Sequence, residues 1–197
     1  MQTDLPFRQH VAIMAIVDLA SVLARVHERC LADGGPIHPR ATPAEIEQAE
    51  ARLGFALPEA LRRLCLEVAN GGVGPVPLYG VGNGRRSPEG DDLVGVYEGL
   101  LRPRPPYPER PGSRLQAVAV EAWPAAVLPL SEPRDGVLFC LDALGGTVLS
   151  GEGHAHELGI PAAEWLQREA TSLEAWLVRW LDGESLPHRP EGPWGGR

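Results

Sequence analysis

The sequence predicts a single α+β domain with a largely antiparallel central sheet packed by helices. Apolar residues recur at helical spacing near both ends of the chain, whereas short apolar runs bounded by turn residues fill the middle. The length of 197 residues suits one domain, and a hydrophobic content of 44% is ordinary for a globular protein. We expect the domain to span residues 1–186, with a proline-rich insertion at about 102–112 and a flexible tail at 187–197.

The first predicted helix runs from about Phe7 to Leu31 and ends at the turn of residues 33–36. Its apolar run from Val11 to Val26 is interrupted by Asp18. Because a membrane span needs about 20 consecutive apolar residues, this run indicates an amphipathic helix instead. A signal peptide is not expected either, because the positively charged region that should precede its apolar core is thin.

Two short helices are predicted next. Thr42 is suited to cap the first, Pro43 to its first turn, and Glu45 stands three residues after the cap, which together form a capping box. This helix should cover 43–53 and the second 58–69. We expect the pair to form a hairpin packed on the sheet through five apolar residues: Ile46, Leu53, Leu61, Leu64 and Val68.

The middle of the chain alternates between strand and loop patterns. A first strand is predicted from Val76 to Val81, followed by a polar loop, and Asp91 or Asp92 should cap a helix over 93–101. Five prolines between Arg102 and Gly112 exclude regular structure there, because proline lacks an N–H donor and disfavours helix before it.

The last third predicts three more strands and a closing helix. The strands are expected at 127–130, 137–141 and 147–150, with a hairpin turn between the last two. Residues 171–174 resemble a second capping box. The helix that follows should end at Gly183 and point five side chains inward: Leu173, Trp176, Leu177, Trp180 and Leu181.

Five short motifs follow one another along the chain: Thr42-Pro43, Leu53-Gly54, Leu57-Pro58, Asn70-Gly71-Gly72 and Leu78-Tyr79-Gly80. Their order resembles the SUKH superfamily. The close match covers residues 42–84, and a looser match continues through 128–130, 136–142 and the final tryptophan-rich helix. That superfamily takes its name partly from a fungal regulator of cell-wall assembly, and most of its bacterial members look like immunity proteins against secreted toxins.

The net charge indicates which kind of partner the protein binds, and the cysteine content indicates the redox state of its compartment. The formal net charge is −8, which argues against a general nucleic-acid binder and suits a basic partner. The cysteines Cys30, Cys65 and Cys140 are odd in number and form no CxxC pair. We therefore expect a reducing, cytoplasmic environment.

No motif in the sequence predicts catalysis. Residues 80–84 follow a GxGxG pattern that precedes a loop instead of a helix, so a structural turn is favoured over a nucleotide site. His154 and His156 lack a second ligand cluster, and Asp91 and Asp92 would face apart on a helix. We expect no enzyme activity, no metal and no cofactor.

The resemblance implies a non-enzymatic immunity protein that binds and neutralises a cognate toxin domain, with no nucleic-acid or membrane partner. The alternative is a regulatory or scaffolding protein of the cell-wall-regulator type, in which the proline-rich segment at 102–108 presents a docking ligand. Charge and loop position suggest an acidic partner-binding face made of Glu89, Asp91, Asp92, Asp135 and Glu152.

Overall fold

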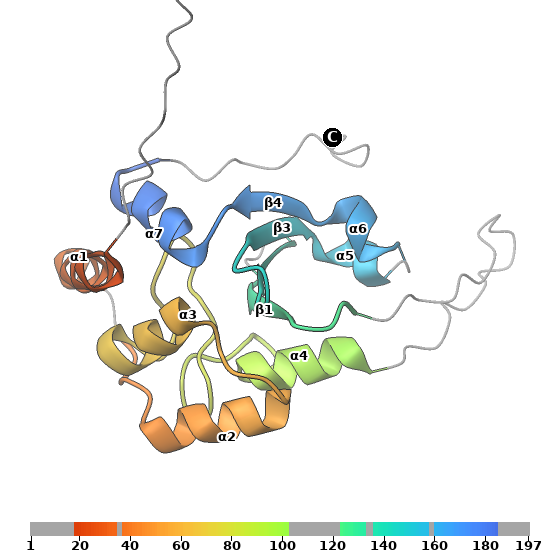
Figure 1. The fold of residues 1–197 in the computed structure, drawn as a ribbon, viewed down its shortest axis with the longest axis horizontal. Helices are drawn as coiled ribbons and strands as arrows, with labels where there is room; N and C mark the ends of the chain where they lie inside the picture. The colour runs from red at the N-terminus through yellow and green to blue at the C-terminus, as the bar shows by residue number, and fades with distance from the viewer. Residues whose placement is uncertain (1–17, 35–36, 103–122, 133–135, 158–159, 185–197) are drawn as a thin grey trace, which may run out of the picture.

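The computed structural model describes residues 18–34, 37–102, 123–132, 136–157 and 160–184 (Figure 1). Its first part is helical and its second part contains the strands. In chain order the elements are α1 (Leu19–Ala32), α2 (Pro43–Leu53), α3 (Glu59–Arg63), the π-helix η1 (Leu64–Val68), α4 (Leu93–Leu101), β1 (Val127–Ser131), β2 (Val137–Asp142), β3 (Val148–Glu152), α5 (Gly153–Glu157), α6 (Ala162–Trp165), β4 (Gln167–Ala170) and α7 (Leu173–Leu181).

The four strands form one antiparallel sheet in the order β1-β2-β3-β4. The pairing of β2 with β3 is regular, from Val137 opposite Glu152 to Leu141 opposite Val148. The pairing of β1 with β2 is interrupted between Pro129 and Ser131, where an extra residue bulges from β1. The predicted α+β class and antiparallel sheet are therefore confirmed.

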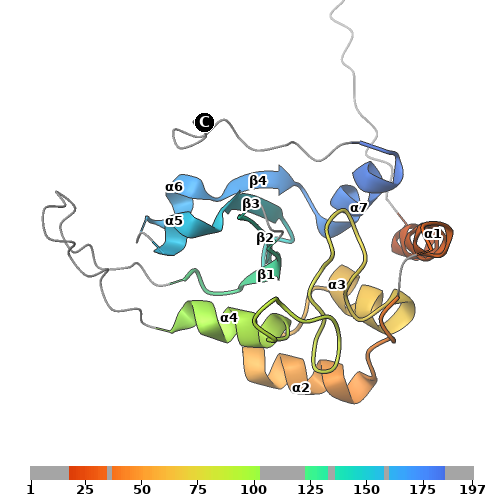
Figure 2. The ribbon, with the colours of Figure 1, turned by 180° about the vertical axis from the view of Figure 1, so that it is seen from behind.

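Helices surround this sheet and also pack on one another (Figures 1 and 2). The α4 helix lies along β1, α2 packs on α4, and α1 lies beside α7. On α7, Trp176 is fully buried, and its ring centroid is 5.4 Å from that of Phe139 on β2. The apolar core is thus continuous from the sheet into the helical layer.

The capping box of α2 is present as predicted. The Oγ1 of Thr42 accepts the N–H of Glu45 at 3.2 Å, and Oε2 of Glu45 accepts the N–H of Thr42 at 2.8 Å. Gly54 ends the helix in the left-handed region, with φ of 79°. The predicted bounds of 43–53 match the observed helix.

The second predicted helix differs from the observed one. It is α-helical only over Glu59–Arg63 and continues as a π-helix over Leu64–Val68, whose end is marked by Ala69 N–H donating to Leu64 C=O at 3.0 Å. The five apolar residues expected to pack are all buried. However, α2 reaches the sheet through α4, and α3 packs on α7.

The predicted strand from Val76 to Val81 is wrong. Residues 74–77 form turns, and the chain beyond them makes one backbone hydrogen bond to β1, from Tyr79 N–H to Leu130 C=O at 2.7 Å. Pro75 and Pro77 explain the difference, because neither can donate to a strand ladder. Leu130, whose carbonyl accepts this bond, is the bulged residue of β1.

The helix predicted from Phe7 begins later in the structure. The α1 helix starts at Leu19, and Asp18 caps it with both carboxylate oxygens, which accept the N–H groups of Ala20 and Ser21 at 3.2 Å each. A short acidic side chain that bonds nearby backbone donors favours a helix start over a helix interior. The predicted part of the helix over residues 7–17 lies outside the described residues.

The last third holds two differences from the predictions. Strand β4 and the short helices α5 and α6 were not expected. The α7 helix is capped by Ser172, which accepts the N–H of Ala175 at 3.1 Å, so the expected box over 171–174 does not form. The remaining predicted elements, α4, β1, β2, β3 and α7, are present within one or two residues of their expected bounds.

Several predicted features lie outside the described residues. These are the proline-rich insertion beyond Arg102, Asp135 and the tail at 187–197. Among the described helices, none is long and apolar enough to cross a membrane.

Candidate functional site: a polar groove between α2 and α4

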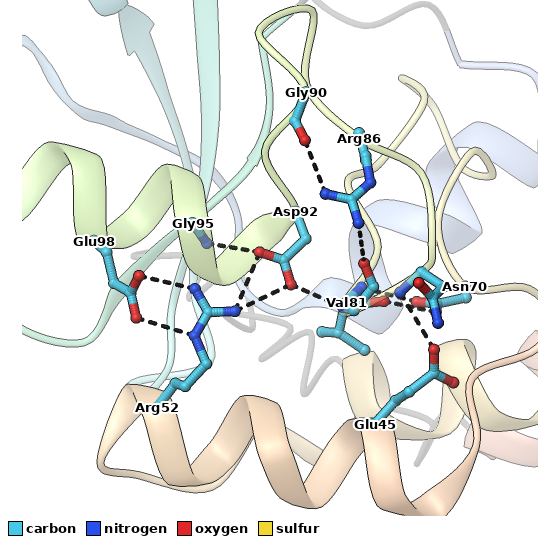
Figure 3. Close-up of polar contacts among 11 residues, drawn as sticks. Glu45, Arg52, Asn70, Val81, Arg86, Gly90, Asp92, Gly95 and Glu98 are labelled. Atoms are coloured by element: carbon cyan, nitrogen blue, oxygen red, sulfur yellow. Dashed lines mark hydrogen bonds and ion pairs between the residues drawn. The ribbon is translucent and has the colours of Figure 1, made fainter.

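A groove of about 450 Å³ lies between α2 and α4, and the loop of residues 82–92 forms its third side (Figure 3). Charged and amide side chains dominate its walls. Glu45, Gln48 and Arg52 come from α2, Asp91 from the loop, Glu98 from α4, and Arg102 from the position just after α4.

Small residues explain why the space between the two helices stays open. Gly95 and Gly99 lie one helical turn apart on the groove side of α4, and Ala49 faces them from α2. A Cβ on Gly95 would lie 3.2 Å from oxygens of Asp91 and Asp92, so a side chain there would require these carboxylates to shift by a few tenths of an ångström. A Cβ on Gly99 would meet nothing within 4 Å, although glycine inside a helix costs roughly 0.5–1 kcal/mol relative to alanine.

The loop beside the groove is anchored on Asn70, which is 2% exposed. Its Nδ2 donates to Val81 C=O and its Oδ1 accepts Val81 N–H, both at 2.8 Å (Figure 3). The backbone carbonyl of Asn70 accepts Arg85 N–H at 2.9 Å. A Cβ on Gly84 would lie 2.5 Å from atoms of Asn70, and one on Gly71 would lie 2.6 Å from the nitrogen of Gly80. The Asn70-Gly71-Gly72 motif and the glycine-rich loop are therefore two sides of one packed unit, in which only glycine fits.

Every backbone N–H of residues 80–84 has an acceptor within the protein. Gly82 donates to Oδ2 of Asp92 at 2.8 Å and Asn83 donates to Oε1 of Glu45 at 3.2 Å, while the other three donate to the side chain of Asn70 and to loop carbonyls. A phosphate-binding loop needs such groups free for its ligand. The geometry therefore supports the interpretation of this loop as a structural turn.

Asp92 connects the loop, α4 and α2. It is 6% exposed, its Oδ1 caps α4 by accepting Gly95 N–H at 2.8 Å, and Arg52 Nη1 lies 3.5 Å from both carboxylate oxygens. Arg52 also donates two hydrogen bonds to the carboxylate of Glu98, from Nε at 3.1 Å and from Nη2 at 2.8 Å (Figure 3). The hydrogen bonds to Glu98 are the main reason that the pKa of Arg52 is raised.

Arg86 holds the two ends of the loop together. Its Nη2 donates to Gly82 C=O at 3.0 Å and its Nη1 donates to Gly90 C=O at 2.8 Å. Within the described part of the chain, this guanidinium forms no ion pair with a carboxylate. Its donors stabilise the loop by binding to loop carbonyls.

Glu45 serves the helix and the loop together. Besides completing the capping box, its carboxylate accepts the N–H of Asn83 in the loop of residues 82–92. The pKa of Glu45 is lowered, first by the backbone N–H of Thr42 and then by the Thr42 hydroxyl. This carboxylate therefore stays ionised and negative beside the groove at neutral pH.

The acidic residues predicted to form one binding face lie in different environments in the structure. Glu89 and Asp91 are exposed on the loop, and Asp91 lines the groove. Asp92 is buried and bonded internally, so it holds the site together. Glu152 ends β3, away from the groove lining. The sequence analysis did not identify Arg52, Arg86, Glu98 or Gly99 as groove residues. The available signal was the pair Gly95 and Gly99, which lie one turn apart inside the predicted helix over 93–101.

The histidines and cysteines that could bind a metal or act as nucleophiles do not line the groove. His154 and His156 lie on α5, and the ring of His156 packs edge-on against Trp123 with centroids 5.1 Å apart. No group of three or more potential metal ligands occurs among the residues that the structure describes. Burial raises the pKa of the Cys65 thiol to about 12, and it also raises the pKa values of Cys30 and Cys140.

Comparison with known proteins places the chain in a family. No curated protein and no solved structure matches the chain. The model of the SMI1 / KNR4 family (SUKH-1) matches residues 40–179, which include α2, the Asn70-anchored loop, the groove, the sheet and most of α7. This match covers well over half of the sequence, so the chain belongs to the SMI1 / KNR4 family (SUKH-1).

Proposed function

We propose that this protein is a non-enzymatic immunity protein that binds a cognate toxin domain in the cytoplasm and neutralises it. Family membership over residues 40–179 is the observation that carries the proposal, because it supports an immunity-like or SMI1/KNR4-type role. Members of the family are generally non-catalytic, which agrees with a function based on binding.

The physical properties of the groove suit a protein partner. Its walls are held by ion pairs and backbone hydrogen bonds, so little conformational entropy is lost when a partner binds. The net charge of −8 favours a basic partner, since complementary charge accelerates association. Glu89 and Asp91 are the exposed members of the proposed acidic face, which would also include Asp135 and Glu152, and Asp92 acts by holding the loop in place.

Co-expression tests the proposal directly. A candidate toxin domain, chosen from the proteins encoded near this chain's gene, is produced in cells with and without the chain, and survival is measured together with co-purification of the two proteins. We expect the chain to restore growth and to co-purify with the domain.

Equal killing with and without the folded chain would remove the immunity role. The regulatory or scaffolding role of the SMI1/KNR4 type would then be preferred. Folding is verified on chain purified from these cells. Its thermal unfolding is compared with that of chain produced without the toxin domain.

A further inference from the structure

We propose that the groove between α2 and α4 receives a basic side chain, arginine or lysine, of the partner protein, with Asp91 as its ion-pair partner. The inference builds on the proposed function for the identity of the partner, but it concerns which surface binds and by which chemistry. Three independent properties of the groove support it.

The first property is the space itself. The groove has a volume of about 450 Å³, and Gly99 lines it without any packing reason to be glycine. Helix propensity favours almost any other residue there, and a Cβ would meet no atom within 4 Å. The space beside Gly99 is therefore kept open at a cost to α4, which is understandable if a partner group occupies it.

The second property is the occupation of the backbone donors near the loop. Carboxylates of the protein already accept the N–H groups of Gly82, Asn83 and Gly95. An anionic ligand would find none of these donors free and would meet the four carboxylates of the groove, those of Glu45, Asp91, Asp92 and Glu98. Anion binding is therefore disfavoured at this end of the groove.

The third property is the state of the charged side chains. Arg52 is neutralised by Asp92 and Glu98, and Arg86 is bound to two loop carbonyls. Arg102 lies one residue beyond the C-terminal end of α4, about 15 Å from Asp92 at 1.5 Å per helical residue. The carboxylate of Asp91 forms no hydrogen bond or ion pair with any residue in the described ranges, so it is available to a cation.

Two pairs of variants test the inference in the complex with the neighbouring toxin domain. Asp91→Asn removes the charge at constant shape, and Glu47→Gln is its control because Glu47 is exposed on α2 but does not line the groove. Gly99→Leu fills the space, and Gly99→Ala is its control because it improves helix propensity with little added volume. Affinity is measured by calorimetry, and folding by denaturant unfolding.

We expect Asp91→Asn to weaken binding roughly three- to tenfold, with an effect that shrinks at high salt. Gly99→Leu should weaken it by about tenfold or more, and both controls should stay within about twofold of the unmodified chain. Unchanged affinity of Asp91→Asn and Gly99→Leu, in a complex that forms, would overturn this inference and leave the proposed function standing.

A short arginine peptide tests the groove without the toxin domain. In an NMR titration, tetra-arginine should shift the amide signals of Gly82, Asn83 and Gly95 more than tetra-glutamate does, and Asp91→Asn should reduce the shifts. If the toxin domain fails to bind, the proposed function fails, and the peptide result alone decides the chemistry of the groove. Equal or larger shifts with tetra-glutamate would show an anion site and contradict the inference.

Discussion

The loop from Asn70 to Asp92 and the sheet with its covering helix α7 are both well packed, but different forces hold them. In the loop, Asn70 and Asp92 are nearly fully buried polar residues that bind backbone groups, and Asp92 also pairs with Arg52. In the sheet region, Trp176 is buried against Phe139 and apolar side chains fill the interior. The stability of the loop depends on the direction of its hydrogen bonds, whereas that of the sheet region depends on how well apolar side chains fill its volume.

This difference explains why the groove lies where it does. Hydrogen bonds are directional, and a buried polar group that loses its partner costs free energy. Buried hydrogen bonds therefore hold a loop in one geometry. Apolar packing tolerates exchanges of similar volume at modest cost. A polar groove built on the loop therefore has walls that keep their shape, although the domain gains most of its stability from the apolar core.

The largest effect should come from the apolar region. Trp176→Ala leaves a large cavity next to Phe139 and should lower the free energy of unfolding by about 3–5 kcal/mol. Trp176→Phe keeps an aromatic ring at the same place and should recover most of that loss. Urea unfolding of both variants measures the two values, and similar losses for both would contradict the volume-dependent character of this region.

A somewhat smaller effect is expected from the loop. Asn70→Ala leaves the N–H and C=O of Val81 buried without their partner, and should cost about 2–4 kcal/mol at roughly 1–3 kcal/mol per stranded group. Asn70→Asp has nearly the same shape, but it loses the donor to Val81 C=O and buries a charge, so it should cost at least as much.

The control for Asn70 is Asn83→Ala in the same loop. Asn83 is exposed, and the substitution keeps its backbone N–H, which donates to Glu45, whereas its side chain makes the smallest of the contributions that lower the pKa of Glu45. This change should stay within about 0.5 kcal/mol. If Asn70→Asp were tolerated as well as Trp176→Phe, the contrast between the two regions would be lost.

Local signals in the sequence predicted those elements whose ends are set by neighbouring residues. Thr42, Pro43 and Glu45 lie within one turn, so the start of α2 was predicted to the residue. For α4 the sequence left Asp91 and Asp92 as alternative caps, and in the structure Asp92 accepts the N–H of Gly95. The capping residue of α7 was placed one position too early, because Thr171 and Ser172 both carry a hydroxyl that can accept a backbone N–H of the first turn.

Features that depend on distant partners were not predictable in this way. Strand β4 has the sequence Gln167-Arg168-Glu169-Ala170, which lacks apolar alternation, and it exists because β3 offers an edge. The groove depends on Arg52 meeting Asp92 and Glu98, which lie 40 and 46 residues further along the chain. Their distances become known only once α2 and α4 are placed side by side, whereas the exposed acids Glu89 and Asp91 were recognisable from loop position alone.

The smallest expected effect concerns the capping box, which joins the helical layer to the loop. Thr42→Ala removes the hydroxyl that accepts Glu45 N–H, and should cost about 1 kcal/mol at neutral pH. Because the pKa of Glu45 is lowered from its ordinary 4.5, ionised Glu45 stabilises the folded state above that pH. This contribution should be lost as the pH falls through the lowered pKa of the folded state.

The pH dependence separates Glu45 from other carboxylates. We expect the stability difference between the unmodified chain and Glu45→Gln to be largest near neutral pH and to shrink as the solution is acidified through the folded-state pKa. Glu47→Gln on the same helix is exposed and serves as the control, with little difference at any pH. Urea unfolding at a series of pH values measures both curves. If the Glu45→Gln difference did not change with pH, the ionised carboxylate would not be what joins α2 to Asn83, and the loop would depend on Asn70 and Asp92 alone.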